Sequence, residues 1–345
     1  MQIKLTEYAH GGGCGCKIAP GLLSKLLEDS GSNAMFPNLL VGYDHADDAA
    51  VYRISESQAL VATTDFFMPV VDDPFDFGRI AATNAISDIY AMGATPIMAL
   101  AVVGMPINKL PVEVIQQILS GGESVCRDAG IPIAGGHSID SQEPIYGLVA
   151  IGLAHPDQIK RNNGARAGDD IVLGKPLGVG ILSAALKKDR LHAAGYTEML
   201  DSTTRLNRPG IALSALPAVH ALTDVTGFGL LGHLLEICRG SGLAAEICFN
   251  DVPVFESARQ YAEQGFVTGA SERNWESYGD GARLPTRFPE WKKNLLTDPQ
   301  TSGGLLVCCS PDATQNILEV FREGGFGAAA RIGKLVESDP LVEVS

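Results

Sequence analysis

The chain has 345 residues, of which 46% are hydrophobic and 19% are charged, and its formal net charge is −14. This length exceeds one ordinary core and predicts two domains, while the acidic balance argues against a surface that coats nucleic acid. Seven cysteines are an odd number, imply no disulfide framework and predict a reducing, cytoplasmic compartment. No stretch is apolar for long enough to cross a bilayer, so no membrane partner is expected.

The stretch from His10 to Lys17 contains three consecutive glycines, two thiols and an ammonium group. Glycine leaves the backbone nearly unrestrained, and a lysine beside a thiol favours the reactive thiolate. We therefore predict that residues 1–20 form a flexible flap that closes over an anionic ligand. Two alternatives stay open at this point: a loose terminus with idle cysteines, or a soft-metal site, such as zinc, formed by His10, Cys14 and Cys16.

Apolar spacing predicts alternating helices and strands in the first half of the chain. The expected helices cover 18–30, 76–92 and 111–129, and the expected strands cover 39–41, 49–54, 60–64, 97–103, 131–134 and 145–153. In the helix over 76–92, Asn84 and Asp88 lie four residues apart on one face. Because their neighbours are small and apolar, we predict a functional role for both rather than simple contact with water.

A polar segment over 155–170 predicts a boundary between domains at 21–156 and 157–345. The expected strands beyond it cover 171–173, 244–249, 305–309 and the C-terminal end. The expected helices cover 181–187, 194–215, 255–264 and 311–323, with another that opens after Asp224 and ends near 239. The stretch over 268–292 is expected to be irregular. Neither half shows a clean βαβ rhythm, so we predict an α+β fold in which helices and strands are mixed.

Aspartates recur where apolar strands begin or end. Asp47 and Asp48 precede one expected strand, Asp65 and Asp224 end two others, and Asp88 lies on a helix. Each one alone is more often a turn or cap residue. Carboxylates at strand ends can converge at one rim of a sheet, and such oxygen ligands suit Mg²⁺ together with the phosphates of a substrate. The group as a whole therefore predicts a metal site.

Nucleotide-binding motifs give a mixed answer. The chain has no P-loop and no protein-kinase catalytic loop. Gly227, Gly229 and Gly232 follow a strand and open a helix, with Asp251 past the next strand, as in a dinucleotide-binding unit. However, Asp224 lies where a pyrophosphate would bind and would repel it without a cation. A metal–phosphate site is the favoured interpretation of this turn.

Seven blocks of the sequence together resemble one enzyme family, selenophosphate synthetase (selenide, water dikinase). The blocks are His10–Lys17, Asp47–Val51, Thr63–Pro69, Ala82–Asp88, Gly135–Ser138, Thr223–Gly232 and Asp298–Gly304. They cover nearly the whole chain in the family's order. Several blocks are shared with the wider superfamily of aminoimidazole-ribonucleotide-synthetase-like ATP enzymes, and the glycine-rich Cys-x-Cys-Lys arm separates this family from those relatives.

The resemblance implies a reaction in which ATP, selenide and water give selenophosphate, AMP and phosphate, with Mg²⁺. The product would supply selenium for selenocysteine and selenouridine. The resemblance also implies the superfamily's two-domain fold and a homodimer, in which the N-terminal halves form a β-barrel-like interface with the ATP site between subunits. A protein that delivers selenium is a further expected partner.

The resemblance assigns a role to individual residues of this sequence. Cys14 takes the catalytic position, which is selenocysteine in some members, and Lys17 is both catalytic and in contact with ATP. The metal-binding positions are Asp48, Asp88 and Asp224. The other ATP contacts are His45, Ala46, Asp47, Asp65 and Asp88, together with Gly136, His137 and Ser138 from the partner subunit.

The residues themselves agree with this assignment, because four aspartates around a polyphosphate require more than one cation between them. They leave open whether Cys14 holds and delivers selenium or positions it for attack. Two other functions also stay open: a relative that activates a carbonyl oxygen and forms ADP, and a thiol-based carrier of metal or selenium without turnover.

Overall fold

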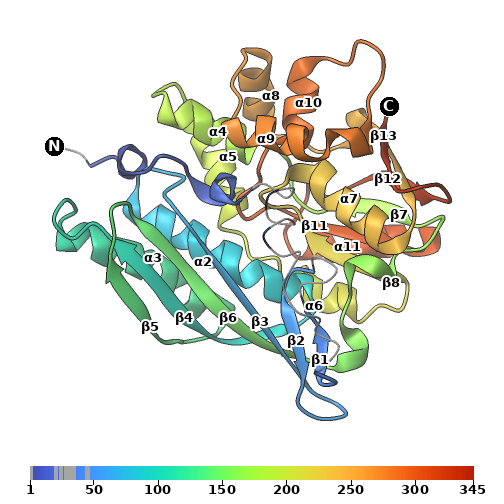
Figure 1. Ribbon diagram of the computed structural model, residues 1–345, viewed down its shortest axis with the longest axis horizontal. Helices are drawn as coiled ribbons and strands as arrows, with labels where there is room; N and C mark the ends of the chain where they lie inside the picture. Colours follow the sequence, from blue (N-terminus) through green and yellow to red (C-terminus); the bar gives the residue numbers. More distant parts are fainter. Residues whose placement is uncertain (1–2, 19–21, 23–25, 27–35, 43–46) are drawn as a thin grey trace.

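The computed structural model describes residues 3–18, 22, 26, 36–42 and 47–345, and it contains two β-sheets with helices packed against them (Figure 1). The strands of the first sheet lie within 39–154 and those of the second within 170–344. The predicted domain boundary after residue 156 falls between the two sheets. Among the described residues, no helix combines the length and the apolar character needed to cross a membrane.

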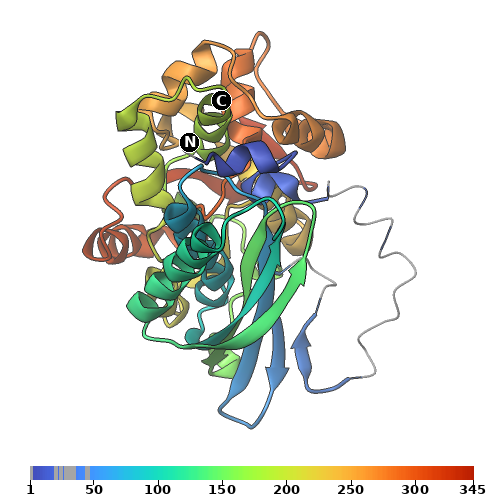
Figure 2. The same ribbon diagram turned by 90° about the vertical axis from the view of Figure 1, so that its left-hand side faces the viewer.

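The first sheet has six strands in the order β1-β2-β3-β6-β4-β5. Its strands are β1 (Leu39–Val41), β2 (Ala50–Arg53), β3 (Ala59–Phe67), β4 (Thr95–Met105), β5 (Ile133–Asp140) and β6 (Ile145–Ala154). Neighbouring strands are antiparallel except for β4 and β5, which are parallel. Helices α2 (Pro74–Ala91) and α3 (Val112–Ala129) cover one face, and no described helix covers the other (Figure 2).

The second sheet has seven strands in the order β10-β13-β9-β12-β7-β11-β8. Its strands are β7 (Asp170–Leu173), β8 (Val219–Asp224), β9 (Ala244–Ile247), β10 (Ala282–Arg283), β11 (Leu305–Cys309), β12 (Ala330–Val336) and β13 (Val342–Val344). The helices of this half are α4 (Val179–Lys187), α5 (Ala193–Thr203), α6 (Pro209–Ser214), α7 (Gly229–Ser241), α8 (Glu256–Glu263), α9 (Gly269–Tyr278), α10 (Glu290–Thr297) and α11 (Thr314–Glu323). Alternate residues of the central strands face opposite layers: Val172 and Val307 pack with α6 and α11, whereas Ile171 and Leu306 belong to the main core.

Local sequence signals determine where several helices begin and end. The Asp73 side chain accepts a hydrogen bond from the backbone N–H of Asp76 at 2.9 Å, and Pro74 follows in the first turn of α2, where its missing N–H costs nothing. Helix α3 ends at Gly130, whose φ of 78° is left-handed. Thr268 caps α9 through its side chain.

Helix α2 connects the two halves of the molecule. Every residue from 80 to 91 is buried, because the helix packs against α3 and the first sheet as well as against β8, α5 and α6. A Cβ at Gly78 would collide with the carbonyl of Ile118, and one at Gly121 would collide with that of Phe75, so these glycines let α2 and α3 approach closely. This burial on all sides explains the small apolar residues of α2 and places its polar side chains in the interior.

The predicted mixed α+β class and most elements are confirmed, including the helices over 76–92 and 111–129. The predicted helix over 18–30 lies largely outside the described residues. The irregular stretch expected over 268–292 is wrong, since α9, β10 and the start of α10 lie there. The single helix expected over 194–215 is α5 and α6, separated before Pro209, which begins α6.

The largest error concerns the glycines near residue 135. The prediction ends a strand before them, but β5 continues through Gly135 and Gly136 to Asp140. Both glycines have positive φ, 148° and 156°, and a Cβ at Gly136 would collide with the carbonyl of Ala101 on β4. The two glycines therefore form an irregular part of β5 that lies very close to β4, rather than a turn. Asp65, similarly, lies inside β3 rather than at its end.

Candidate active site

Three aspartates from distant parts of the chain meet where the two halves touch; we call them the aspartate triad. Asp48 lies just before β2, Asp88 is near the end of α2, and Asp224 is the last residue of β8. One carboxylate oxygen of each lies within 4.8 Å of the others, and no other such group of acidic, histidine or cysteine side chains occurs in the described ranges. The three lie together as expected from their positions, and metal binding by them remains a prediction.

Hydroxyl groups orient the triad. Each carboxylate accepts one hydrogen bond from a neighbouring hydroxyl: Asp48 from Thr223 (2.7 Å), Asp88 from Thr63 (2.6 Å) and Asp224 from Ser87. The second oxygen of Asp48, Oδ2, is buried and has no hydrogen-bond partner within the described part of the chain. A buried carboxylate oxygen without a donor is costly unless a cation binds it.

Burial and crowding dominate the electrostatics of the triad. Burial raises the pKa of Asp48 and of Asp88 well above the ordinary value, and the negative charge of Asp224 adds to both shifts. Burial also raises the pKa of Asp224, against the opposing hydrogen bond from Ser87. Carboxylates in such a group hold protons or share a cation. The oxygen-only donor set and the orphaned oxygen fit a hard divalent ion.

The N-terminal flap lies over the triad and carries Cys14 and Lys17. A short 3-10 helix, η2 (Gly13–Cys16), shapes it. The Cys14 backbone N–H donates to Thr301 Oγ1 at 3.0 Å, and Lys17 Nζ lies 3.4 Å from Asp65 Oδ2. Burial lowers the pKa of Lys17, but the carboxylate of Asp65 and the other acids outweigh burial and raise it overall. Lys17 is therefore a positive charge beside Asp65, and the carboxylates of Asp88 and Asp224 also act on it.

Cys14 is a neutral thiol in this arrangement. Its side chain is 1% exposed, and its Sγ donates to Asn84 Oδ1 at 3.1 Å. Burial raises the pKa of Cys14 strongly, and Lys17 opposes this shift while Asp65 adds to it. The prediction that Lys17 favours the thiolate is therefore wrong for this conformation, because the sequence does not reveal burial or the surrounding acids.

Asn84 and the loop over 298–304 hold the flap in place. Asn84 Oδ1 also accepts from the backbone N–H of Ser302 at 2.7 Å, and its Nδ2 donates to Asp65. Ser302 has a φ of 52°, an uncommon value for a residue other than glycine. Thr301 and Ser302 thus contact the site although the sequence analysis gives them no role. In the sequence they fall within the block Asp298–Gly304, which contributes to the family resemblance but assigns no role to either residue.

A buried aspartate anchors the same loop. Asp298 is fully buried, and its Oδ2 accepts from the Gly180 N–H and from Gln300 Nε2, both at 2.9 Å. Burial raises the pKa of Asp298 to about 8. In the unfolded chain the group ionises near its ordinary value of 3.8. Between these two values the folded protein binds a proton that the unfolded chain does not, so this group's contribution to stability falls as the pH rises.

Replacing Asp298 with asparagine is expected to remove that loss. The amide keeps an acceptor for Gly180 but cannot ionise, so Asp298→Asn gains stability relative to the unchanged protein as the pH rises, by at most about 1.4 kcal/mol per pH unit. Urea unfolding at about pH 5, 6.5 and 8 measures this difference. The exposed Asp312→Asn is the matched control. A pH-independent difference for Asp298→Asn would contradict the assignment.

The other predicted ATP contacts do not all lie at the triad. Asp47 Oδ1 accepts from the backbone N–H of Asn162 at 2.8 Å, and His45 and Ala46 lie outside the described residues. Gly136 and its two successors lie on β5, three strands away from Asp65 on β3, roughly 14 Å at normal strand spacing. A single chain does not bring them to the triad.

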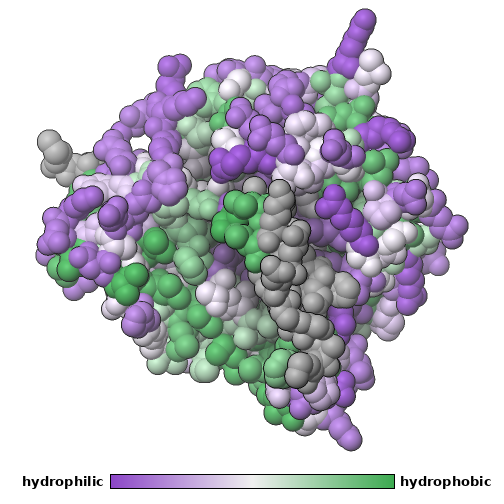
Figure 3. Space-filling view, in the orientation of Figure 1, coloured by the Kyte–Doolittle hydropathy of each residue, from purple (hydrophilic) through white to green (hydrophobic). Residues whose placement is uncertain are grey.

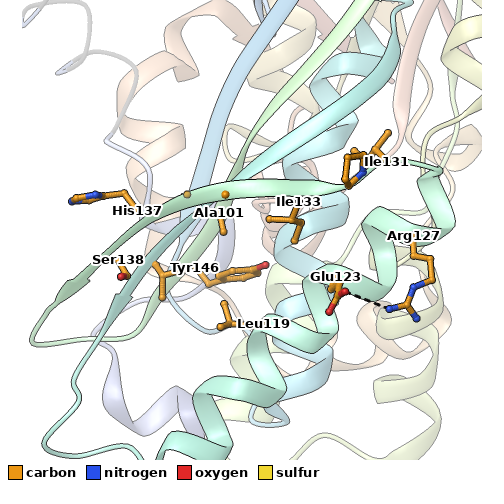
Figure 4. Close-up of a pocket in the computed structure, with 13 residues that line it drawn as sticks. Ala101, Leu119, Glu123, Arg127, Ile131, Ile133, His137, Ser138 and Tyr146 are labelled. Carbon is orange, nitrogen blue, oxygen red and sulfur yellow. Dashed lines mark ion pairs between the residues drawn. The ribbon is translucent and has the colours of Figure 1, made fainter.

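A pocket of about 560 Å³ lies between β5 and α3 (Figure 4). Ser138, Leu119 and Tyr146 line it, and Glu123 and Arg127 form an ion pair of 3.6 Å at one side. None of its lining residues belongs to the triad or the flap. In Figure 4 the His137 ring points away from Leu119 and Tyr146, toward the other side of the strand.

Two alternatives from the sequence are disfavoured by these contacts. His10 Nδ1 pairs with Glu143 at 2.8 Å while Cys14 faces Asn84, so the zinc site is not formed in this conformation. A Cβ at Gly227 would lie 2.8 Å from the carbonyl oxygen of Cys14. The flap therefore occupies the turn where a dinucleotide-binding unit would hold a pyrophosphate.

Comparisons with known proteins agree with this architecture. The family model of AIR synthase related proteins matches in two parts, the N-terminal domain over residues 46–154 and the C-terminal domain over 166–344. The solved HypE–HypF complex has a chain with a TM-score of 0.69 at 18% identity, covering 94% of this chain and 96% of that one. The solved structure of thiamine-monophosphate kinase from Stenotrophomonas maltophilia K279a has a TM-score of 0.64 at 23% identity. The match covers 90% of this chain and 92% of that one. At these identities the likeness shows the fold alone.

Curated relatives are far more similar. Selenide, water dikinase from Paraburkholderia xenovorans is 64% identical over 341 residues, covering 99% of this chain and 96% of the relative. Selenide, water dikinase from Dechloromonas aromatica is 60% identical over 343 residues, covering 99% of this chain and 99% of the relative. One from Rhizobium meliloti is 58% identical over 341 residues, covering 99% of this chain and 98% of the relative. Because such identity extends over both domains and the flap, the chain belongs to the selenide, water dikinase family of AIR synthase related proteins.

Proposed function

We propose that this protein makes selenophosphate from ATP, selenide and water, with AMP and phosphate as the other products. Its relatives over nearly full length are named selenide, water dikinase. The observation that carries the proposal is the flap, which buries Cys14 and places Lys17 beside Asp65 over three converging carboxylates. The product would serve as selenium donor for selenocysteine and selenouridine.

The aspartate triad would hold Mg²⁺, and more than one ion would bind when the nucleotide is present. Bound Mg²⁺ would mask the charge of the polyphosphate and so allow it to lie among the acids. The buried Oδ2 of Asp48 supports this assignment. Asp47 and Asp65 would contact ATP near the metal, with His45 and Ala46 beside them.

The chain's own residues would contribute charge, position and exclusion of water. Lys17 provides positive charge where phosphoryl oxygens become more negative. The closed flap keeps out water that would hydrolyse an intermediate. Asn84 holds the Cys14 thiol and the Asp65 carboxylate together, so that the sulfur stays beside the nucleotide whether it delivers selenium or positions it.

Product analysis tests this function directly. Incubation with ATP, Mg²⁺ and selenide should give a selenophosphate signal in phosphorus NMR, together with AMP. Formation of ADP alone would indicate a relative that activates an oxygen, and binding of selenium without ATP consumption would indicate a carrier. Omission of selenide is the control, since the transfer that forms selenophosphate has no acceptor without it.

The open face of the first sheet supports a homodimer. Leu60, Ala62 and Phe66 of β3 point away from the helices, as alternation with the buried Val61 requires. Figure 3 shows apolar side chains gathered over these strands, and strand β5 is exposed along its length from residue 134 to 140. An exposed edge and an apolar face are both expected to be covered by a partner.

We propose that the partner subunit supplies Gly136, His137 and Ser138 to the ATP site. A selenium-delivery protein and a cytoplasmic location complete the proposal.

Mixing two inactive variants tests the shared site. If His137 acts across the interface, Cys14→Ala and His137→Ala chains each lack activity, but a mixed dimer has one intact site and one with both lesions. Unfolding and refolding the two together should restore about a quarter of the normal activity, because half of the dimers are mixed. Each variant refolded alone is the control. No recovery, with mixed dimers shown by native mass spectrometry, would place both residues in the same subunit's site.

A further inference from the structure

A basic groove lies on the outer face of the flap, opposite the acids. Its volume is about 340 Å³, and its lining includes Gly11, Gly12 and Gly15 of the flap. The charged residues that define the basic groove are Lys187 and Lys188 at the end of α4 and Arg273 in α9. Nothing in the proposed function uses this groove.

The cations of the groove are not neutralised by acids. Lys187 Nζ donates to the carbonyl of Ala9 at 3.1 Å, and Arg273 Nη2 donates to that of Gly15 at 3.1 Å. Lys188 Nζ lies 5.2 Å from the centre of the Phe266 ring. None of the three forms an ion pair with a described residue. In a chain with net charge −14, three unpaired cations around one hollow create a local positive potential.

Two acids near the groove, Glu143 and Asp189, already have partners. Glu143 pairs with His10 at 2.8 Å, and Asp189 pairs with Lys4 at 2.5 Å. Helix α9 begins in the lining with Gly269 and Ala270, so its terminal N–H groups add to the positive field. The groove is therefore built to attract an anion.

The flap separates two opposite potentials. On its inner face lie Asp65 and the triad, where a polyphosphate would add further negative charge. On its outer face lies the basic groove, whose lining includes Thr301, the residue that accepts the Cys14 N–H at 3.0 Å. Thr301 therefore both lines the groove and contacts the backbone of Cys14. A small anion approaching the thiol from the acidic side is repelled, whereas from the groove it is attracted.

We propose that the basic groove is the binding site through which the hydrogen selenide anion reaches Cys14. Hydrogen selenide is a monoanion at neutral pH and carries no metal to mask its charge, unlike ATP. This inference rests on the proposed function and adds a separate entry side for the second substrate. It assigns Lys187, Lys188 and Arg273 to selenide binding rather than to the nucleotide.

Lys188 is the residue to change first, because it makes no hydrogen bond to the flap. Lys188→Gln should raise the KM for selenide roughly fivefold and leave the KM for ATP unchanged, and Lys187→Gln/Lys188→Gln should raise it further. Raising the salt concentration should weaken selenide use in the unchanged protein more than in the variants. Lys188→Arg keeps the charge and should restore the KM. Lys334→Gln, on β12 of the second sheet, is the control for loss of a lysine elsewhere.

A second measurement does not depend on turnover. Cys16 is half-buried; burial and the charge of Glu143 raise the pKa of its thiol, and the positive charges of Lys187 and Arg273 oppose that shift. An anionic reagent, iodoacetate, should therefore modify Cys16 faster relative to neutral iodoacetamide than it modifies Cys248, and Lys187→Gln/Lys188→Gln should lower that ratio. Mass spectrometry of the two peptides gives the rates.

The outcomes separate the two proposals. Absence of selenophosphate from the unchanged protein would overturn the proposed function, while the alkylation ratio would still report on the groove. An active protein whose selenide KM is unchanged in Lys187→Gln/Lys188→Gln would overturn the groove as entry site. Equal rises in the KM for selenide and for ATP would do the same, since they would place the cations at the nucleotide.

Discussion

Cys14→Ser lowers selenophosphate formation by roughly 100-fold or more, the loss expected when a group at the reacting centre is removed. Serine is nearly the same size and can still donate to Asn84 Oδ1, as the thiol does at 3.1 Å. The backbone contact with Thr301 is also kept. The flap should therefore close normally while the sulfur chemistry is lost. Phosphorus NMR measures the product, and protection of the flap from proteolysis measures closure.

Cys16→Ser is the matched control for this experiment. It changes the other thiol of the flap, which lies in contact with the backbone of Met68 rather than with Asn84. Selenophosphate formation should stay within a few-fold of normal. Near-normal turnover by Cys14→Ser would remove the thiol from the mechanism and leave it as a packing residue.

Asp48→Asn has two opposite effects, a loss of metal-dependent nucleotide binding and a gain in metal-free stability. Its Oδ1 can still accept from Thr223, but the charge that would hold Mg²⁺ is gone. The Mg²⁺ concentration needed for ATP binding should rise about tenfold or more, as for the loss of other metal-site groups. Without metal, removal of one buried charge beside Asp88 and Asp224 should stabilise the fold by about 1 kcal/mol or more.

Thermal unfolding with and without Mg²⁺ and ATP measures both effects of Asp48→Asn. The unchanged protein should gain stability from the ligands by mass action. The variant should unfold at a higher temperature without ligands, and its unfolding temperature should rise less when they are added. Asp312→Asn is the control for loss of an exposed carboxylate. A variant that is less stable without metal, yet gains as much from Mg²⁺ and ATP, would exclude a metal site at the triad.

The sequence predicts the triad because the signal is local. Asp48 and Asp224 lie at the ends of short apolar runs, and Asp88 lies on a helix that is otherwise largely small and apolar. Side chains at such positions come together where the edges of sheets meet a buried helix. The helices α2 and α3 are predicted for similarly local reasons: each runs for eighteen residues, α2 as a nearly continuous apolar stretch and α3 with a clear apolar face.

The sequence fails where contacts between distant segments decide the outcome. Gly135 and Gly136 suggest a turn, but the close approach of β4 makes them part of a strand. The thiol of Cys14 is neutral because segments far along the chain bury it and place acids around it. Helices α9 and α10 are polar stretches flanked by glycine and proline. Packing of both against α7, and of α10 against α8, stabilises them rather than their periodicity.

The bond between Cys14 and Thr301 joins residues separated by 287 positions. During translation Thr301 is made 287 residues after Cys14, so this bond can form only after that length of chain has been synthesised. Until then the contacts that bury Cys14 in the folded protein are incomplete. An exposed thiol is open to oxidation, so Cys14 should react with a thiol reagent in chains that end before Thr301 and be protected in the folded protein.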